Sequence, residues 1–128
     1  SNQQFIYSLR RMLDPIKEHV DNNFNPLPAE YTKEFAPVRQ KINDLMRMSC
    51  EQIETNRYED YREILAEADA CKDELSVLRK KHIDRIQHLS DNSLMQISLV
   101  YLNVLQESQE FLSVMRHQLR AAKKFMEK

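Results

Sequence analysis

The stretch YLNVLQESQEFLSVMRHQLRAAKKF, residues 101–125, has neither Gly nor Pro and places an apolar or small side chain at every third or fourth position. Side chains at this spacing share one face of an α-helix, so the pattern predicts a long amphipathic helix over residues 93–126. The predicted inward face consists of Leu94, Ile97, Tyr101, Val104, Leu105, Ser108, Phe111, Leu112, Met115, Leu119 and Ala122. A face this wide is typical of a helix that packs into a bundle core.

The rest of the chain shows the same periodicity and predicts three further helices, over residues 3–23, 35–55 and 58–89. The 128 residues include no Gly, and aromatic residues make up 8%, a composition that favours helix over strand. The inward face of the first helix is predicted to be Phe5, Leu9, Met12, Leu13, Ile16 and Val20. We therefore predict a single all-α domain, with an antiparallel up-and-down four-helix bundle as the simplest fold.

Prolines are expected to shape the first half of the chain. Pro15 removes a backbone donor within residues 3–23, which predicts a kink there, or a restart of the helix that Asp14 caps. The stretch NFNPLPAEY, residues 23–31, is expected to end this helix because two prolines so close together do not continue it. Pro37 is then expected in the first turn of the helix over 35–55.

Asparagine is expected at the helix ends, because it is the next best residue after Gly in the left-handed conformation that closes a helix. Asn22 or Asn23, Asn56 and Asn92 stand near the three predicted breaks. Asp91 or Asn92 is also predicted to cap the start of the last helix.

Charge is expected to pair the last two helices. The first half of the helix over 58–89 is acidic, with Glu59, Asp60, Glu63, Glu67, Asp69, Asp73 and Glu74. The end of the helix over 93–126 is basic, with Arg116, Arg120, Lys123 and Lys124. A tight turn near Asp91 would lay these two blocks side by side, an arrangement that also suits both helix dipoles.

Composition and motifs argue against several classes of function. The net charge is −1, and aromatic residues do not interleave with the basic ones, so no nucleic-acid partner is expected. No Glu-x-x-His pair is present, which argues against a ferritin-like oxidase, and a chain without Gly has no glycine loop to cradle phosphates. Cys50 and Cys71 are predicted to be buried structural residues, and His82 a hydrogen-bonded core residue. We expect a protein that is not an enzyme.

Two carboxylate or amide pairs are candidates for a divalent metal ion at the surface. Asp69 and Asp73 lie four residues apart and share a helix face, and Asn103 and Glu107 do the same on the last helix. Oxygen ligands of this type suit hard cations. The alternative is that all four belong to an ordinary solvated face.

Two basic segments are candidates for contact with an anion or with anionic lipid headgroups. Residues 78–88 contribute Arg79, Lys80 and Lys81, and residues 116–124 contribute Arg116, Arg120, Lys123 and Lys124. The alternative is that these cations simply complement the dipoles at the C-terminal ends of their helices.

The segments YLNVLQESQEF and RHQLRAAKKF, in residues 101–125, resemble the closing helix of the PhoU-like domain at the C-terminus of bacterial sodium/phosphate cotransporter family proteins. The stretch DACKDELSVLRKKHIDRI, residues 69–86, is similar to the helix that precedes it in that domain. Together these cover about half of the chain. Residues 1–58 match only in being helical and amphipathic.

The resemblance implies a PhoU-like bundle that regulates or scaffolds phosphate transport on the cytoplasmic face of the bacterial inner membrane. Its main partner would be the transmembrane transporter part of the same chain, with spans upstream of this segment. Independently of the resemblance, Ser1 and Asn2 are interpreted as a remnant of cloning. PhoU proteins bind metal clusters through acidic-x-x-x-Asp motifs, which Asp69-Ala-Cys-Lys-Asp73 matches and Asn103-Val-Leu-Gln-Glu107 matches more loosely.

Two other functions remain open from the sequence. One is a free-standing helical interaction module, which would form a homo-oligomer or bind a partner helix in a groove of the bundle. The other is a metal-binding bundle that uses the surface carboxylates of residues 69–73 and 103–107.

Overall fold

The computed structural model describes residues 2–127, and all of its regular structure is helical. The helices are α1 (Asn2–Phe24), α2 (Ala29–Thr55), α3 (Tyr61–Gln87) and α4 (Asn92–Met126). No strand occurs within the described residues. The predicted all-helical class and the number of helices are confirmed. The interpretation of Ser1 as a cloning remnant lies outside the described residues.

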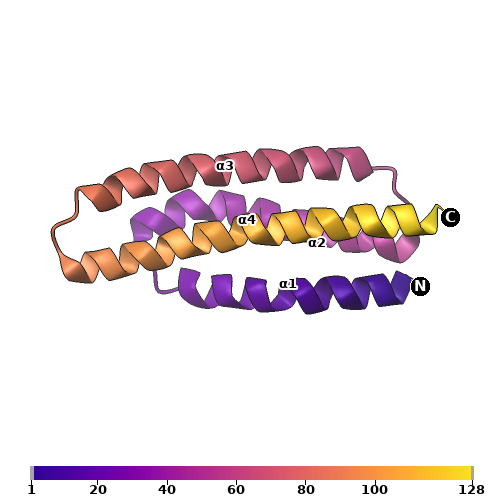
Figure 1. Ribbon diagram of the computed structural model, residues 1–128, viewed down its shortest axis with the longest axis horizontal. Helices are drawn as coiled ribbons and strands as arrows, with labels where there is room; N and C mark the ends of the chain where they lie inside the picture. Colours follow the sequence, from indigo (N-terminus) through magenta and orange to yellow (C-terminus); the bar gives the residue numbers. More distant parts are fainter. Residues whose placement is uncertain (1, 128) are drawn as a thin grey trace.

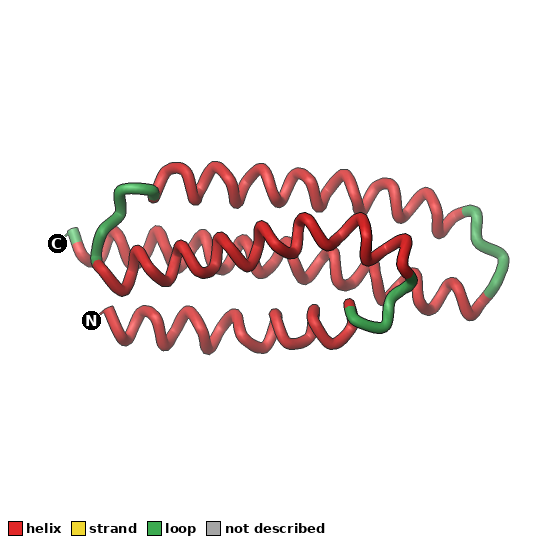
Figure 2. The backbone as a smooth tube through the Cα atoms, turned by 180° about the vertical axis from the view of Figure 1, so that it is seen from behind, coloured by secondary structure: helices red, strands yellow, loops and turns green. Residues whose placement is uncertain are grey.

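The four helices lie lengthwise beside one another, joined by the short loops 25–28, 56–60 and 88–91 (Figures 1 and 2). The chain reverses direction at each loop, so the start of α1 and the end of α4 lie at the same end of the molecule (Figure 1). Helix α4 contacts all three other helices, whereas α1 and α3 do not touch each other within the described residues. The hairpin of α3 and α4 projects beyond α1 at the opposite end (Figure 1).

Helix α2 begins earlier than the sequence pattern predicted. It starts at Ala29, directly after Pro28, so Pro37 lies well inside the helix and the predicted start at residue 35 is wrong. Pro37 has no N–H to bond the carbonyl of Lys33, four residues back. Both residues are exposed, so water can solvate that carbonyl and the helix continues. The prolines of the loop, rather than Pro37, mark the beginning of α2.

Helix α1 continues through Pro15 without interruption, so the predicted restart capped by Asp14 does not occur. Pro15 and Arg11, whose carbonyl loses its helical donor, are both exposed. The unpaired carbonyl is therefore accessible to water, and one missing bond does not end the helix. Asn23 lies inside α1 and donates from Nδ2 to the backbone carbonyl of His19 at 2.8 Å, so it is not an end cap.

Two of the predicted caps are confirmed. Asn56 follows α2 in the left-handed conformation, with φ 53° and ψ 36°, and its N–H closes the last turn. Asp91 precedes α4, and its carboxylate accepts a hydrogen bond from the Ser93 N–H at 2.8 Å. Asn92 is the first residue of α4 rather than a cap at the end of α3.

Asn56 gives a test of the α2 cap. Asn56→Ala is expected to lower the free energy of unfolding by about 1 kcal/mol, because a residue with a Cβ and no compensating polar group is strained at positive φ. Asn56→Gly is expected to be neutral or stabilising, because Gly adopts this conformation without cost. Urea denaturation of both variants measures the difference. Equal stability of the two would contradict the left-handed geometry.

One apolar core joins all four helices. Its largest fully buried side chains are Leu9, Leu13, Phe35, Ile53, Ile64, Leu75, Tyr101, Leu105, Phe111, Leu112, Met115 and Leu119. Three residues that we predicted to face inward are instead exposed: Met12 by 48%, Leu94 by 46% and Ile97 by 37%. Leu94 and Ile97 lie in the first two turns of α4. The start of this helix projects beyond α1 (Figure 1).

The predicted charge pairing between α3 and α4 is present at one point. Arg116 Nε lies 3.1 Å from Asp69 Oδ1, and Lys123 Nζ lies 5.1 Å from the centre of the Tyr61 ring. Glu74 instead pairs with Lys41 of α2 at 2.7 Å. The acidic face of α3 is thus shared between its two neighbours.

Within residues 2–127, none of the helices combines the length and the apolar character that a membrane crossing requires.

Candidate functional site

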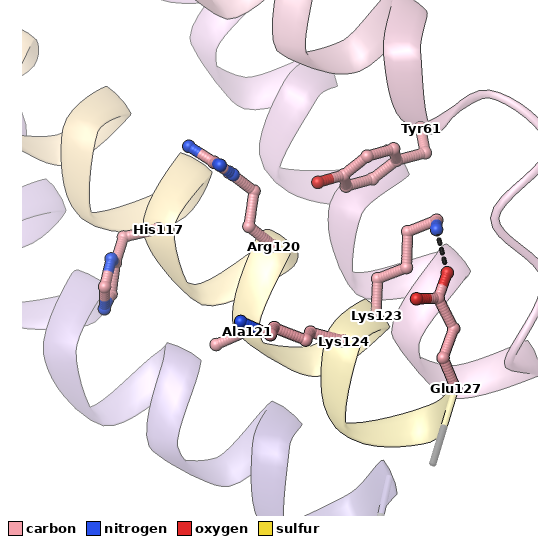
Figure 3. A pocket seen from close by; sticks show the side chains of 7 residues that line it. All are labelled: Tyr61, His117, Arg120, Ala121, Lys123, Lys124 and Glu127. Carbon is pink, nitrogen blue, oxygen red and sulfur yellow. Dashed lines mark hydrogen bonds and ion pairs between the residues drawn. The ribbon is translucent and has the colours of Figure 1, made fainter.

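A basic groove lies at the end of the molecule that carries the start of α1 and the end of α4. It has a volume of about 600 Å³ and is lined by Tyr61, His117, Arg120, Ala121, Lys123, Lys124 and Glu127 (Figure 3). Five of these residues come from the last turns of α4, Glu127 directly follows that helix, and Tyr61 is the first residue of α3. We call this surface the basic groove. It contains three of the residues predicted for anion contact: Arg120, Lys123 and Lys124.

The cations of the basic groove are not equally available. Lys123 forms an ion pair with Glu127, one turn further along, and sits over the Tyr61 ring (Figure 3). Arg120 and Lys124 are exposed, and neither has an ion-pair or hydrogen-bond partner among the described residues. These two side chains therefore carry positive charge that nothing in residues 2–127 neutralises directly.

The other predicted anion contacts lie outside the basic groove and are mostly occupied. Arg116 pairs with Asp69, and Lys81 Nζ lies 3.2 Å from Glu34 Oε2. Arg79 donates to the Gln109 side-chain oxygen at 3.1 Å. Lys80 is exposed and has no partner among the described residues, but it does not line the basic groove.

The two candidate metal pairs face different neighbours. Asp69 bonds Arg116 of α4, whereas Glu107 bonds the His19 ring of α1. Asp73 and Asn103 are exposed. Within residues 2–127, no group of three or more His, Cys, Asp or Glu residues lies close enough together to hold a metal ion. Metal binding at Asp69 and Asp73 stays a prediction.

A buried polar cluster crosses the core near the opposite end of the bundle. His82 is fully buried, and its Nε2 lies 2.7 Å from the Ser98 carbonyl, so the ring donates there in the tautomer that carries the proton on Nε2. Its ring packs edge-on against Tyr31 and Tyr101, with centroids 4.9 Å and 4.6 Å away. The prediction that His82 is a hydrogen-bonded core residue is confirmed.

Glu34 and Arg85 form the charged part of this cluster. Arg85 donates to both carboxylate oxygens of Glu34, and Tyr101 donates to Oε1 at 2.8 Å. Burial alone would raise the pKa of Glu34, but the hydrogen bonds from Arg85, Tyr101 and Lys81 outweigh it and hold the pKa below its usual value. Burial and the bond to Glu34 raise the pKa of Tyr101. The cluster therefore joins α2, α3 and α4 with its carboxylate ionised and its phenol neutral.

Sequence reasoning missed the Glu34–Arg85 pair, although a signal for it was present. Glu30 and Glu34 lie one turn apart on α2, and Lys81 and Arg85 lie one turn apart on α3. Arg85 bonds Glu30 at 3.0 Å as well as Glu34, which makes a ladder of opposite charges between the two helices. The early start of α2 was needed to see it, because residue 30 was placed in a loop.

The two cysteines are buried and unpaired, as predicted. Burial raises the pKa of the Cys71 thiol to about 11, with a smaller contribution from nearby Glu74. Burial also raises the pKa of Cys50. Both thiols are therefore protonated at neutral pH, which suits a structural role rather than a nucleophilic one.

The buried state of His82 predicts a dependence of stability on pH. Burial lowers the pKa of His82 below the ordinary histidine value of about 6.5, so the unfolded chain takes up this proton first as the pH falls. The free energy of unfolding should therefore fall as the pH drops below about 6.5. His82→Gln keeps a donor for the Ser98 carbonyl but does not titrate, and should lose this part of the dependence. Urea denaturation at pH 8 and pH 5.5 tests both proteins, and identical pH profiles would contradict the assignment.

A scan against family models, a search of curated proteins and a search of solved structures each returned no match to this chain.

Proposed function

We propose that this chain is a non-catalytic PhoU-like regulatory domain, folded as an antiparallel up-and-down bundle. In this proposal it lies on the cytoplasmic face of a bacterial inner membrane and is attached to a sodium-dependent phosphate transporter. Its partner is the transmembrane part of the same chain, which precedes α1, and its role is to modulate phosphate uptake or export. The resemblance of residues 69–86 and 101–125 to that domain supports the proposal.

The observation that carries the proposal is the position of the basic groove. Arg120 and Lys124 lie near the end of α4, and the start of α1 lies at this same end of the bundle (Figure 1). A membrane segment that precedes α1 would bring this end close to the lipid surface. The cytoplasmic leaflet is negatively charged and attracts basic residues by about 1 kcal/mol each. The unpaired cations are thus where a membrane-attached domain would need them.

Phosphate uptake in cells tests the proposal. In cells that carry the native gene, sodium-dependent uptake of labelled phosphate would be compared between the full-length protein and a form that lacks this segment. We expect the deletion to change the uptake rate, or its response to external phosphate, while the transporter part remains in the membrane. Unchanged uptake in both respects, at equal protein levels, would contradict a regulatory role.

Exposed apolar residues favour a second candidate, a free-standing interaction module. Leu94, Ile97, Leu99 and Val100 are between 37% and 50% exposed on the first turns of α4. Such residues would be covered in a homo-oligomer or by a partner helix. Light scattering coupled to size-exclusion chromatography shows whether the isolated chain is a monomer or a homo-oligomer. A dimer that Leu99→Ser with Val100→Ser disrupts would favour this function, and a monomer at high concentration would count against self-association.

A further inference from the structure

We propose that the basic groove is a binding site for a phosphate group, held by Arg120 and Lys124. The group is either inorganic phosphate or the phosphodiester of an anionic lipid headgroup, because both present negatively charged terminal phosphate oxygens. The proposed function places the basic groove next to the membrane, and this inference rests on it by naming the ligand that the groove would bind there. It can be tested on the isolated chain.

Charge is the first argument for a phosphate. Lys123 and Glu127 neutralise each other, and Arg116 is paired with Asp69, so neither pair adds net charge to the groove. Arg120 and Lys124 remain without an anionic partner within residues 2–127. Two uncompensated cations can balance a phosphate group that carries two negative charges, as an inorganic phosphate dianion does, and they also attract a phosphodiester, which carries one.

Spacing is the second argument. Arg120 and Lys124 lie one helical turn apart, where Cβ atoms are about 5–6 Å from each other, so both can reach one ligand. Arg supplies a planar fork of donors that matches two phosphate oxygens, and Lys supplies a mobile point charge for a third. His117 lies three residues before Arg120 and also lines the groove. The donor types and their spacing therefore suit a group with several oxygens.

The wall of the groove supplies a further donor. The Tyr61 hydroxyl has no hydrogen-bond partner among the described residues, and it projects to the same side of α4 as Arg120 in Figure 3. Lys123 packs over the Tyr61 ring and keeps the ring in place at the edge of the groove. The groove is open to solvent, so a ligand as large as a lipid headgroup has access to it.

A matched pair of double variants tests the site. Arg120→Gln with Lys124→Gln removes the two free cations. Lys33→Gln with Lys80→Gln removes the same charge from exposed, unpartnered lysines on α2 and α3. Lys80 lies 19 residues beyond Tyr61 on α3, roughly 28 Å along the helix at ~1.5 Å per residue. All four changes are on the surface, and circular dichroism with thermal melting would show that both variants fold.

Two probes separate the sources of phosphate. Sodium phosphate would be titrated against sodium chloride at equal ionic strength, with amide NMR shifts as the readout. Vesicles of phosphatidylglycerol and of phosphatidylcholine would be used in co-sedimentation. We expect saturable shifts confined to residues 116–127 and Tyr61, or sedimentation with phosphatidylglycerol vesicles only, in the unmodified chain and in the Lys33/Lys80 variant. Either response should be lost in the Arg120/Lys124 variant.

Each result of the phosphate and vesicle experiments leads to a different conclusion. A response to free phosphate assigns the groove to that ion, and a response to phosphatidylglycerol alone assigns it to lipid headgroups. No response to either probe, or a response that persists without Arg120 and Lys124, overturns the site. Equal loss in the Lys33/Lys80 variant overturns it too, because binding would then reflect overall charge. Phosphate binding with unchanged uptake after deletion would refute the proposed function and leave the site intact.

Discussion

Leu105→Asp should lower the free energy of unfolding by at least about 4 kcal/mol, because it places a carboxylate with no counter-charge in the core. Leu105 is 0% exposed and lies on α4, the helix that contacts all the others. Because Leu105 is fully buried, the aspartate carboxylate could not reach water without disturbing the packing of the helices. The variant is expected to be largely unfolded at room temperature, as measured by circular dichroism and urea denaturation.

The control for this substitution is on the same helix. Leu99 is 50% exposed, so Leu99→Asp should change the free energy of unfolding by no more than about 0.5 kcal/mol. Both substitutions replace a leucine of α4 by aspartate, so they differ only in the burial of the site. Equal destabilisation of the two variants would show that the inward face of α4 is assigned wrongly. A near-native stability of Leu105→Asp would lead to the same conclusion.

Arg85→Met should lower the free energy of unfolding by about 2 kcal/mol, because it leaves the Glu34 carboxylate in the bundle without its main partner. The Glu34 and Arg85 side chains are 13% and 20% exposed, so the expected loss is smaller than for a fully buried pair. Adding Glu34→Gln to Arg85→Met should recover part of the stability, because an amide needs no counter-charge. Urea denaturation of the single and double variants measures both steps.

Lys41→Met is the matched control for Arg85→Met. Lys41 and Glu74 form the same type of ion pair between α2 and α3, but their side chains are 49% and 42% exposed. Water solvates Glu74 when its partner is removed, so we expect little change in the melting temperature. If Arg85→Met were as mild as Lys41→Met, the Glu34 network would be an ordinary surface feature.

Periodicity alone was sufficient for much of the fold. The apolar spacing of Leu105, Phe111 and Leu112 on α4 placed all three correctly in the core. A long helix in a bundle is buried along one continuous face, and that face is visible in the sequence as apolar residues at every third or fourth position. The same pattern failed for Leu94 and Ile97, because burial also depends on where the neighbouring helix ends.

Boundaries were harder to predict than faces. Pro15 and Pro37 both lie inside helices. Each leaves the carbonyl four residues before it without a helical donor, but those residues, Arg11 and Lys33, are exposed to water, and a single missing bond is tolerated. Asn56 was predicted correctly, since a chain without Gly has few residues that adopt positive φ at low cost. Local chemistry identifies a cap well, but it does not show whether a proline interrupts a helix.

The candidate site was predictable only in part. The cations of residues 116–124 were visible in the sequence, but their partners were not. Asp69 neutralises Arg116 from a position 47 residues away, and only the packing of α3 on α4 decides that Arg120 and Lys124 are left free. The Glu34–Arg85 pair joins residues 51 positions apart for the same reason. Contacts between helices, and not the helices themselves, separate structural charges from available ones.

Fractionation of cells that naturally make this protein, probed with an antibody against residues 1–128, shows whether the chain is covalently attached to a membrane protein. We expect a band much larger than 15.3 kDa that stays in the membrane fraction after washing with carbonate, as a covalently attached transporter part requires. A soluble band near 15.3 kDa would rule out attachment to a transporter and leave a stand-alone helical bundle.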